Sequence, residues 1–323
     1  MMIGSPIICL LFLGTIFTLD PRYTRCKGNT REMFQEISNG PRSDKFAIAS
    51  GWVARPEVSD VISNHTPDGT WYEVSGNETG PVVVLCHGVG LDLHMWDQQL
   101  PALTPDFQVV RYDFIGHGKT PPNPEVSNLG AFTRQLFALL EHLGLERITL
   151  VGLSMGGVIA QRFAADHPEL LIRLVLMNTV YQRGPKELEG VEARLRITEE
   201  EGLSPITDSA IARWFDDDFV DEHPEIVDRI KIRLLTNDLA GYLAAYRVFV
   251  YAESEVGSAL KSVQCPTLVM TGGRDTGSTP VMAHRMAEDL ADARVVIFDE
   301  LHHLAPLESP DQVNAELLSF LNG

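Results

Sequence analysis

Short apolar runs alternate with amphipathic segments along most of the chain. The runs are typical of strands buried on both faces, and the amphipathic segments are typical of the helices that cover such strands. The pattern therefore predicts an α/β fold, with a mostly parallel central sheet and helices on both faces. We expect strands at residues 69–74, 82–86, 108–112, 148–153, 174–177, 267–271 and 295–298, and helices at residues 129–143, 281–290 and 310–321.

The alternation stops between residues 181 and 258, where the pattern is helical and acidic and no core strand is expected. Helices are expected there at residues 187–197, 206–214, 226–236 and 239–251. A helical insertion in such a series is typical of a lid over the carboxyl ends of the strands, where open α/β sheets bind ligands. The alternative is that these helices extend the core. We therefore expect a core of residues 68–180 and 259–323, with a helical lid insertion at 181–258.

Residues 1–50 lack the alternating pattern. Residues 6–19 are mostly apolar, but this run is shorter than a membrane-spanning helix needs. No Lys or Arg precedes it and no A-x-A cleavage site follows it. Three interpretations stay open: a disordered or non-native extension, a weak secretion signal or anchor, and a structured accessory segment. We expect a cytoplasmic protein, or a secreted one if the apolar run is a true signal.

The net charge is −18, which argues against nucleic acid or an anionic membrane as a partner. The four cysteines (Cys9, Cys26, Cys86 and Cys265) have neither metal-ligand nor disulfide-framework spacing. No metal site is expected, and no cofactor either, because the glycine-rich segments lack a phosphate-binding pattern. The expected partner is a small molecule, and the oligomeric state is not predicted.

One apolar run, residues 148–153, leads into a G-x-S-x-G motif formed by Gly152, Ser154 and Gly156. A helical pattern follows, which is the strand–turn–helix context of a nucleophile elbow. The glycines allow a turn sharp enough to hold the serine in a strained conformation. The motif predicts Ser154 as a nucleophile; the alternative is a glycine-rich turn with a helix-capping serine.

A serine hydroxyl needs a base, and the base needs an orienting acid. In this fold class the chain order is Ser, then Asp or Glu, then His. Asp275 follows a predicted strand, and His303 lies between the last strand and the last helix. We expect Asp275 as the acid and His303 as the base, against the alternatives of a turn-forming aspartate and a solvated loop histidine. The end of the strand at residues 174–177 is another possible place for the acid, but it carries Asn178, which has no charge.

The loop at residues 87–90, which we call the oxyanion loop, follows the strand at 82–86. The backbone N–H groups of Val89 and Met155 are expected to stabilise an oxyanion. His87 is interpreted as a residue that bonds the loop backbone rather than as a second base. Asp113 and His117, after the next strand, are likewise interpreted as structural residues of their loop.

These motifs, in this order, resemble the α/β-hydrolase superfamily over about residues 68–323, and within it the 3-oxoadipate enol-lactonase and carboxylesterase group. The chain departs from the group at His302, where its members usually have glycine before the catalytic histidine. The matching segments are His87-Gly-Val-Gly, Leu91-Asp-Leu-His-Met-Trp-Asp, Asp113-x-x-Gly-His-Gly, Gly152-Leu-Ser-Met-Gly-Gly, Arg213-Trp-Phe, Asp238-Leu-Ala-Gly-Tyr, Asp275, and His303-x-x-x-x-Glu308-x-Pro310.

The resemblance implies a serine hydrolase that cleaves a small ester or an enol-lactone through an acyl-enzyme. The free carboxylate of such a lactone needs a cation, for which Arg134 and Arg213 are candidates, Arg213 beside Trp214 in the lid. Both arginines are alternatively ordinary surface residues. Two other functions stay open: C–C bond hydrolysis or acyl transfer on the same fold, and ligand binding without catalysis.

Overall fold

The computed structural model describes residues 11–12, 15–16 and 61–323 of a chain that divides into two units, Met1–Ser50 and Gly51–Gly323. In the first unit, β1 (Leu11–Phe12) pairs antiparallel with β2 (Thr15–Ile16). The extension, signal or accessory segment predicted at residues 1–50 otherwise lies outside the described residues. Within the described ranges, no helix combines the length and apolar character needed to span a membrane.

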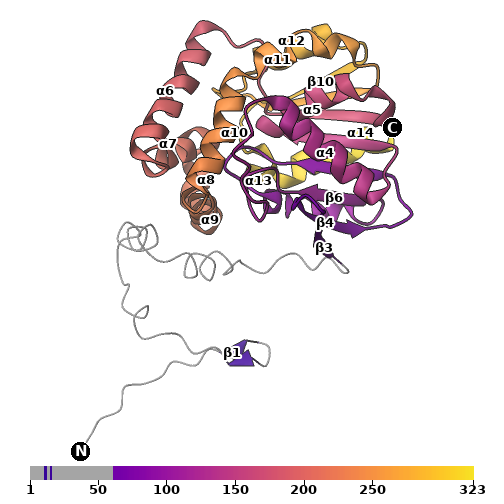
Figure 1. Cartoon of the computed structure of the whole chain (residues 1–323), viewed down its shortest axis with the longest axis horizontal. Coiled ribbons are helices and arrows are strands. Elements are labelled where there is room, and N and C mark those ends of the chain that lie inside the picture. The colour runs from indigo at the N-terminus through magenta and orange to yellow at the C-terminus, as the bar shows by residue number, and fades with distance from the viewer. Residues whose placement is uncertain (1–10, 13–14, 17–60) are drawn as a thin grey trace, which may run out of the picture. The chain divides into compact units, whose positions relative to one another are not determined.

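The second unit contains an eight-stranded sheet (Figure 1). The strands from β10 to β6 run parallel, and the strands β4 and β3 at one edge pair antiparallel. The predicted mostly parallel sheet is therefore confirmed. In spatial order the strands are β10 (Ala293–Phe298), β9 (Thr267–Gly272), β8 (Leu171–Met177), β7 (Ile148–Leu153), β5 (Val82–Cys86), β6 (Gln108–Tyr112), β4 (Trp71–Gly76) and β3 (Ile62–His65).

The sheet begins earlier than the sequence predicted. Strand β3 precedes residue 68, and the strand expected at residues 69–74 is β4, shifted by two residues. All four residues of β3 are exposed, and the strand reads Ile-Ser-Asn-His. It carries no apolar pattern because backbone pairing with β4, rather than burial, holds it in the sheet.

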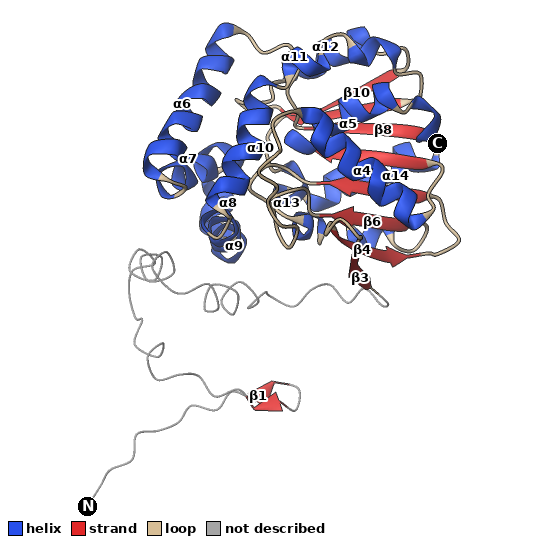
Figure 2. Ribbon diagram, in the orientation of Figure 1, coloured by secondary structure: helices blue, strands red, loops and turns tan. Residues whose placement is uncertain are grey.

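Helices cover both faces of the sheet (Figure 2). Alternate residues of β5 enter different clusters of buried side chains, Val84 and Cys86 on one face and Val83 and Leu85 on the other. The first cluster includes residues of α4 (Leu129–Leu143), α5 (Met155–Asp166) and α12 (Pro280–Asp289). The second includes residues of η1 (Leu93–Trp96), α3 (Leu100–Leu103), α13 (Ala305–Glu308) and α14 (Pro310–Asn322). Two short 3₁₀ helices, η2 (Pro168–Leu170) and η3 (Ala259–Ser262), precede β8 and β9, and η3 buries Leu260.

Between β8 and β9 the chain forms only helices, as the sequence predicted. They gather beyond one end of the sheet strands in Figure 1. The short helix α8 was not expected, because its acidic sequence buries only Phe219 and shows no periodicity. The insertion consists of α6 (Pro185–Glu201), α7 (Ser204–Trp214), α8 (Asp217–Glu222), α9 (Pro224–Leu235), α10 (Leu239–Tyr251) and α11 (Glu253–Val256).

Candidate active site

Ser154 occupies the sharp turn between β7 and α5, with φ 55° and ψ −117°. This backbone conformation is strained for a residue with a side chain. The flanking glycines permit it, because a Cβ on Gly152 would collide with the carbonyl of Gly156. A Cβ on Gly156 would collide with the carbonyls of Cys86 and His87 on the neighbouring strand end. The turn therefore has the geometry of the elbow that the motif predicts.

The backbone of Ser154 is fixed on both sides. Its N–H donates to Met177 O at 3.0 Å, and its carbonyl accepts from Thr179 Oγ1 at 2.7 Å. The residue is 5% exposed. Among the described hydrogen bonds none joins Ser154 Oγ to His303, so the structure holds the two residues by separate contacts. A direct bond between a nucleophile and its base is often looser in the absence of substrate.

Asp275 and His303 form a direct pair, in which His303 Nδ1 lies 2.7 Å from Asp275 Oδ2. The other carboxylate oxygen accepts the N–H groups of Gly277 and Ser278, both at 2.9 Å. Burial alone would raise the pKa of Asp275, but the His303 charge and these hydrogen bonds hold it below its ordinary value. An ionised Asp275 that accepts from Nδ1–H leaves Nε2 as the ring nitrogen free to accept a proton.

Asn178 also belongs to this cluster, although the sequence predicted no role for it. Its Nδ2 donates to Asp275 Oδ2 at 3.0 Å and to the His302 carbonyl at 3.1 Å. The residue is fully buried and has φ 45°, a region that Asn tolerates better than most residues. The sequence places Asn178 at a strand end that suits the catalytic acid. Because its side chain carries no charge, no role was predicted for it.

Glu308 fixes the segment before His303. Its Oε2 accepts the His302 N–H at 2.6 Å, and its Oε1 lies 3.0 Å from His302 Nδ1. The same Oε1 accepts the N–H of Asp216, which belongs to the insertion, at 3.0 Å. His302, at the position where the resembling group usually has glycine, is thus held by its own side chain as well as by its backbone.

The oxyanion loop lies against Ser154, since a Cβ on Gly88 would be 3.4 Å from the Ser154 Cβ. Gly88 O accepts from His87 Nδ1 at 2.8 Å and from Leu91 N at 3.2 Å. Gly88 C=O and Val89 N–H belong to one trans peptide, so these bonds also orient the Val89 N–H. Within residues 61–323, neither this N–H nor that of Met155 donates to a protein group.

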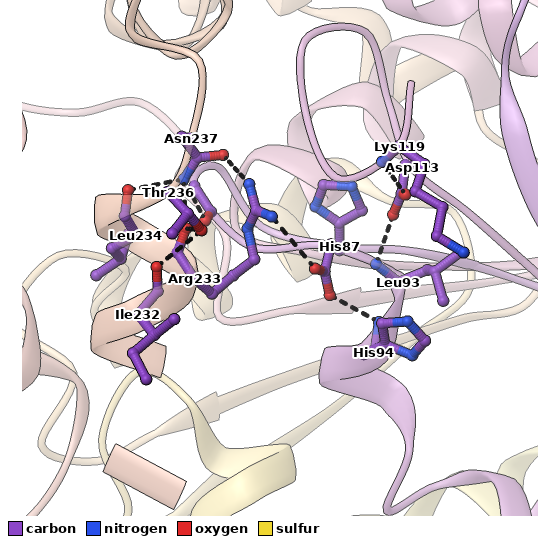
Figure 3. Close-up of polar contacts among 12 residues, drawn as sticks. His87, Leu93, His94, Asp113, Lys119, Ile232, Arg233, Leu234, Thr236 and Asn237 are labelled. Atoms are coloured by element: carbon purple, nitrogen blue, oxygen red, sulfur yellow. Dashed lines mark hydrogen bonds and ion pairs between the residues drawn. The ribbon is translucent and has the colours of Figure 1, made fainter. Parts of the chain in front are cut away.

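His87 and Asp113 bond loop backbone, as predicted. Phe114 N–H donates to His87 Nε2 at 3.2 Å, and burial holds the pKa of His87 well below its ordinary value. Asp113 accepts the N–H groups of Leu93 and Lys119, each at 2.8 Å (Figure 3). The two side chains therefore shape the loops beside Ser154.

The three residues expected to bind substrate lie in different settings. Trp214 stacks on His303, with ring centroids 6.0 Å apart. Arg213 is half-buried on α7; burial and the charge of Arg194 lower its pKa, while Asp275 opposes that shift. Arg134 is exposed on α4 and makes no described contact with Ser154, Asp275 or His303. The structure thus brings Trp214 onto His303, and the substrate-binding roles of Trp214, Arg213 and Arg134 stay predictions.

In the described ranges no group of three or more His, Cys, Asp or Glu side chains is arranged to hold a metal ion. Of the two described cysteines, both free, Cys86 is buried and Cys265 is half-buried. Burial raises the pKa of the Cys86 thiol to about 12. Cys86 is thus an unreactive core residue at neutral pH.

The chain is similar to known hydrolases over most of its length. The alpha/beta hydrolase family matches residues 83–316. A 3-oxoadipate enol-lactonase of Acinetobacter baylyi is 30% identical over 246 residues, which cover 75% of this chain and 89% of the relative.

Two solved structures extend the comparison. The enol-lactonase of Burkholderia xenovorans is 27% identical with a TM-score of 0.71, covering 83% of this chain and 99% of that one. A malate-bound thermophilic esterase of Thermogutta terrifontis is 29% identical with a TM-score of 0.69, covering 82% and 98%. The resemblance to enol-lactonases and esterases read from the motifs is therefore confirmed, and the chain belongs to the alpha/beta hydrolase family.

Proposed function

We propose that the protein is a serine hydrolase that cleaves a small carboxylic ester or an enol-lactone, with Ser154 as nucleophile, His303 as base and Asp275 as orienting acid. The observation that carries this proposal is the buried Asp275–His303 pair at 2.7 Å, together with the strained turn at Ser154. The broader assignment, an ester-cleaving hydrolase, is supported by the family and by relatives named as enol-lactonases and an esterase.

In the proposed reaction, Ser154 Oγ attacks the carbonyl carbon while His303 Nε2 takes its proton. The N–H groups of Val89 and Met155 donate to the oxygen on which negative charge develops, and the start of α5 adds a favourable dipole. His303 returns the proton to the leaving oxygen, and an acyl-enzyme remains. Water, activated by His303, then releases the acid and restores Ser154. When the substrate is an enol-lactone, the released enol tautomerises to a ketone.

The finer proposal is an anionic enol-lactone, such as 3-oxoadipate enol-lactone. Such a substrate keeps a free carboxylate outside the lactone ring. Arg213 supports it, because this cation is half-buried on α7, next in the chain to Trp214, whose ring stacks on His303. The esterase relative with bound malate, a dicarboxylate, is consistent with a site of this kind. In this proposal the insertion at residues 181–258 acts as the lid, and Trp214 shields His303 from water.

The test compares steady-state hydrolysis of 3-oxoadipate enol-lactone and p-nitrophenyl butyrate by the unchanged protein and by Ser154→Ala. We expect Ser154→Ala to lower kcat by about 10⁴-fold or more while the melting temperature stays similar, because only the nucleophile is lost. A lactone kcat/KM of about 10⁴ M⁻¹s⁻¹ or above, with the ester far slower, would support the lactonase assignment.

Turnover that survives in Ser154→Ala would contradict the nucleophile assignment. Ester turnover without lactone turnover would leave a carboxylesterase and remove the finer proposal. If neither substrate is turned over, the proposed reaction is wrong, and an acyl transferase, a C–C bond hydrolase or a ligand-binding protein would explain the fold instead.

A further inference from the structure

The segment between α9 and α10 reaches from the insertion to the oxyanion loop. We propose that Asn237 is a positioning residue, whose side-chain amide holds the Gly90 carbonyl and so fixes the peptide that presents the Val89 N–H. The oxyanion site is then complete only when the insertion is docked. This inference rests on the proposed function, because it requires the Val89 N–H to receive the negative charge of the transition state.

Both ends of the Asn237 amide are bound. Its Nδ2 donates to Gly90 O at 2.8 Å and to the carbonyls of Arg233 and Leu234 at 3.0 and 3.1 Å. Its Oδ1 accepts from Arg233 Nη2 at 2.6 Å (Figure 3). The residue is 8% exposed, so little water competes for these bonds. A buried amide held at both the oxygen and the nitrogen has one orientation, with the nitrogen toward Gly90.

Arg233 adds a second link between the insertion and the segment that follows the loop. Its Nη1 lies 3.6 Å from Asp92 Oδ2, and Asp92 Oδ1 accepts the His94 N–H at 3.0 Å. Burial, His117 and the charge of Arg233 all lower the pKa of His87, which favours the neutral ring. A neutral His87 can donate from Nδ1 to Gly88 O while it accepts at Nε2, which is the bonding observed.

Gly90 is shaped for this approach. Its φ is +80°, and a Cβ there would lie 2.6 Å from Leu234 Cδ2 and 3.1 Å from Tyr242 Cε2. Residues of α9 and α10 therefore pack directly on the Gly90 backbone. Any side chain at this position would separate the insertion from the loop.

Two peptide groups, linked by a hydrogen bond, connect Asn237 to the Val89 N–H. Gly90 C=O, held by Asn237, belongs to the same peptide as Leu91 N–H. Leu91 N–H donates to Gly88 O at 3.2 Å, and Gly88 C=O belongs to the same peptide as Val89 N–H. Because each peptide is planar, rotation of the Gly90–Leu91 peptide would break its hydrogen bond to Gly88 O. The Val89 N–H would then no longer be held in its present direction.

The test is Asn237→Asp, measured with p-nitrophenyl butyrate and with a fluorophosphonate probe that reacts with Ser154. Aspartate keeps the size of the side chain and accepts from Arg233, but it has no N–H for Gly90 O. We expect kcat to fall about tenfold, less than the 10²–10³-fold seen when a whole oxyanion donor is removed. KM should stay within about twofold, and the labelling rate should fall by the same factor as kcat, because both reactions build charge on an oxygen in this site.

Asn314→Asp is the matched control. Asn314 Nδ2 donates to Gln98 O at 3.1 Å, so the same replacement removes the same kind of bond between α14 and the core. We expect a similar fall in melting temperature, with kcat and the labelling rate within about twofold of the unchanged protein. If Asn237→Asp does not fold, Asn237→Ala removes the donor without adding charge and is judged by the same two rates.

Equal kcat and labelling rates in the Asn237 variant and the Asn314 variant would overturn the positioning role and leave the proposed function intact. Failure of the proposed function would be seen in other measurements: no turnover by the unchanged protein, or turnover that survives in Ser154→Ala. It would overturn the positioning role as well.

Discussion

At the scale of single residues, the site depends on groups that hold the reactive side chains rather than on those side chains alone. Asp275 is bound by His303, by two backbone N–H groups and by Asn178. The Asn178 amide also bonds the His302 carbonyl, next to His303 in the chain. Asn178 therefore fixes both members of the Asp275–His303 pair.

Replacement of Asn178 by Gly tests this role, since glycine keeps the positive φ and removes the amide. We expect kcat for p-nitrophenyl butyrate to fall about tenfold, because a freed Asp275 orients His303 less well. Gln182→Gly is the control: Gln182 also has positive φ (51°) but is exposed and bonds Asp289. An equal loss of kcat in the two variants would assign the effect to the backbone alone.

At the scale of secondary-structure elements, the insertion contributes to the site at several points. The end of α7 places Trp214 on His303, and Leu304 N–H donates to the Trp214 carbonyl at 3.2 Å. Asp216, which follows α7, bonds Glu308, and the segment between α9 and α10 bonds the oxyanion loop through Asn237. These contacts tie the insertion to the loops that carry both His303 and Val89.

The position of Arg213 on α7 leads to a prediction about substrate charge. We expect Arg213→Gln to raise KM for 3-oxoadipate enol-lactone about tenfold or more, because a charge-assisted hydrogen bond to the free carboxylate is lost. KM for the neutral p-nitrophenyl butyrate should change less than about twofold. Arg247→Gln, which breaks an exposed ion pair with Glu199 elsewhere in the insertion, serves as control. Similar effects on the charged and the neutral substrate would refute the carboxylate-binding role.

At the scale of the whole molecule, burial of neutral histidines links stability to pH. His117 is 1% exposed, and its Nε2 has no hydrogen-bond partner among the described residues. Burial, opposed only in part by the hydrogen bond to Ile115 O, lowers the pKa of His117 to about 3. The unfolded chain takes up this proton near pH 6.5. The associated stability is therefore present above pH 6.5 and is lost progressively as the pH falls toward 3.

We expect His117→Phe to reduce the loss of unfolding free energy between pH 6.5 and 4.5 by about 2 kcal/mol, because the variant has no proton to take up on unfolding. Urea unfolding at a series of pH values measures this difference. His284→Phe, at an exposed position on α12, should leave the pH dependence unchanged. If the His117 variant loses stability with acid as steeply as the unchanged protein, the histidine is not buried in its neutral form.

The sequence determined the elements whose signal is local. Buried strands such as residues 148–153 are continuous apolar runs, and α4 has a regular apolar stripe, so their limits were predicted closely. Glycines around Ser154 specified the turn, because their spacing reflects steric limits within a few residues. Chain order after each strand identified Asp275 and His303 as a candidate pair, since parallel strands end at one edge of the sheet.

Only the tertiary structure decided features that depend on contacts between distant residues. Strand β3 has no apolar pattern and exists because β4 pairs with it. The roles inferred for Asn178 and Asn237 rest on hydrogen bonds to residues 97 and 147 positions away in the chain. An uncharged amide has no periodicity and no motif of its own. The partner that gives it a role becomes visible only when the folded chain brings the two together.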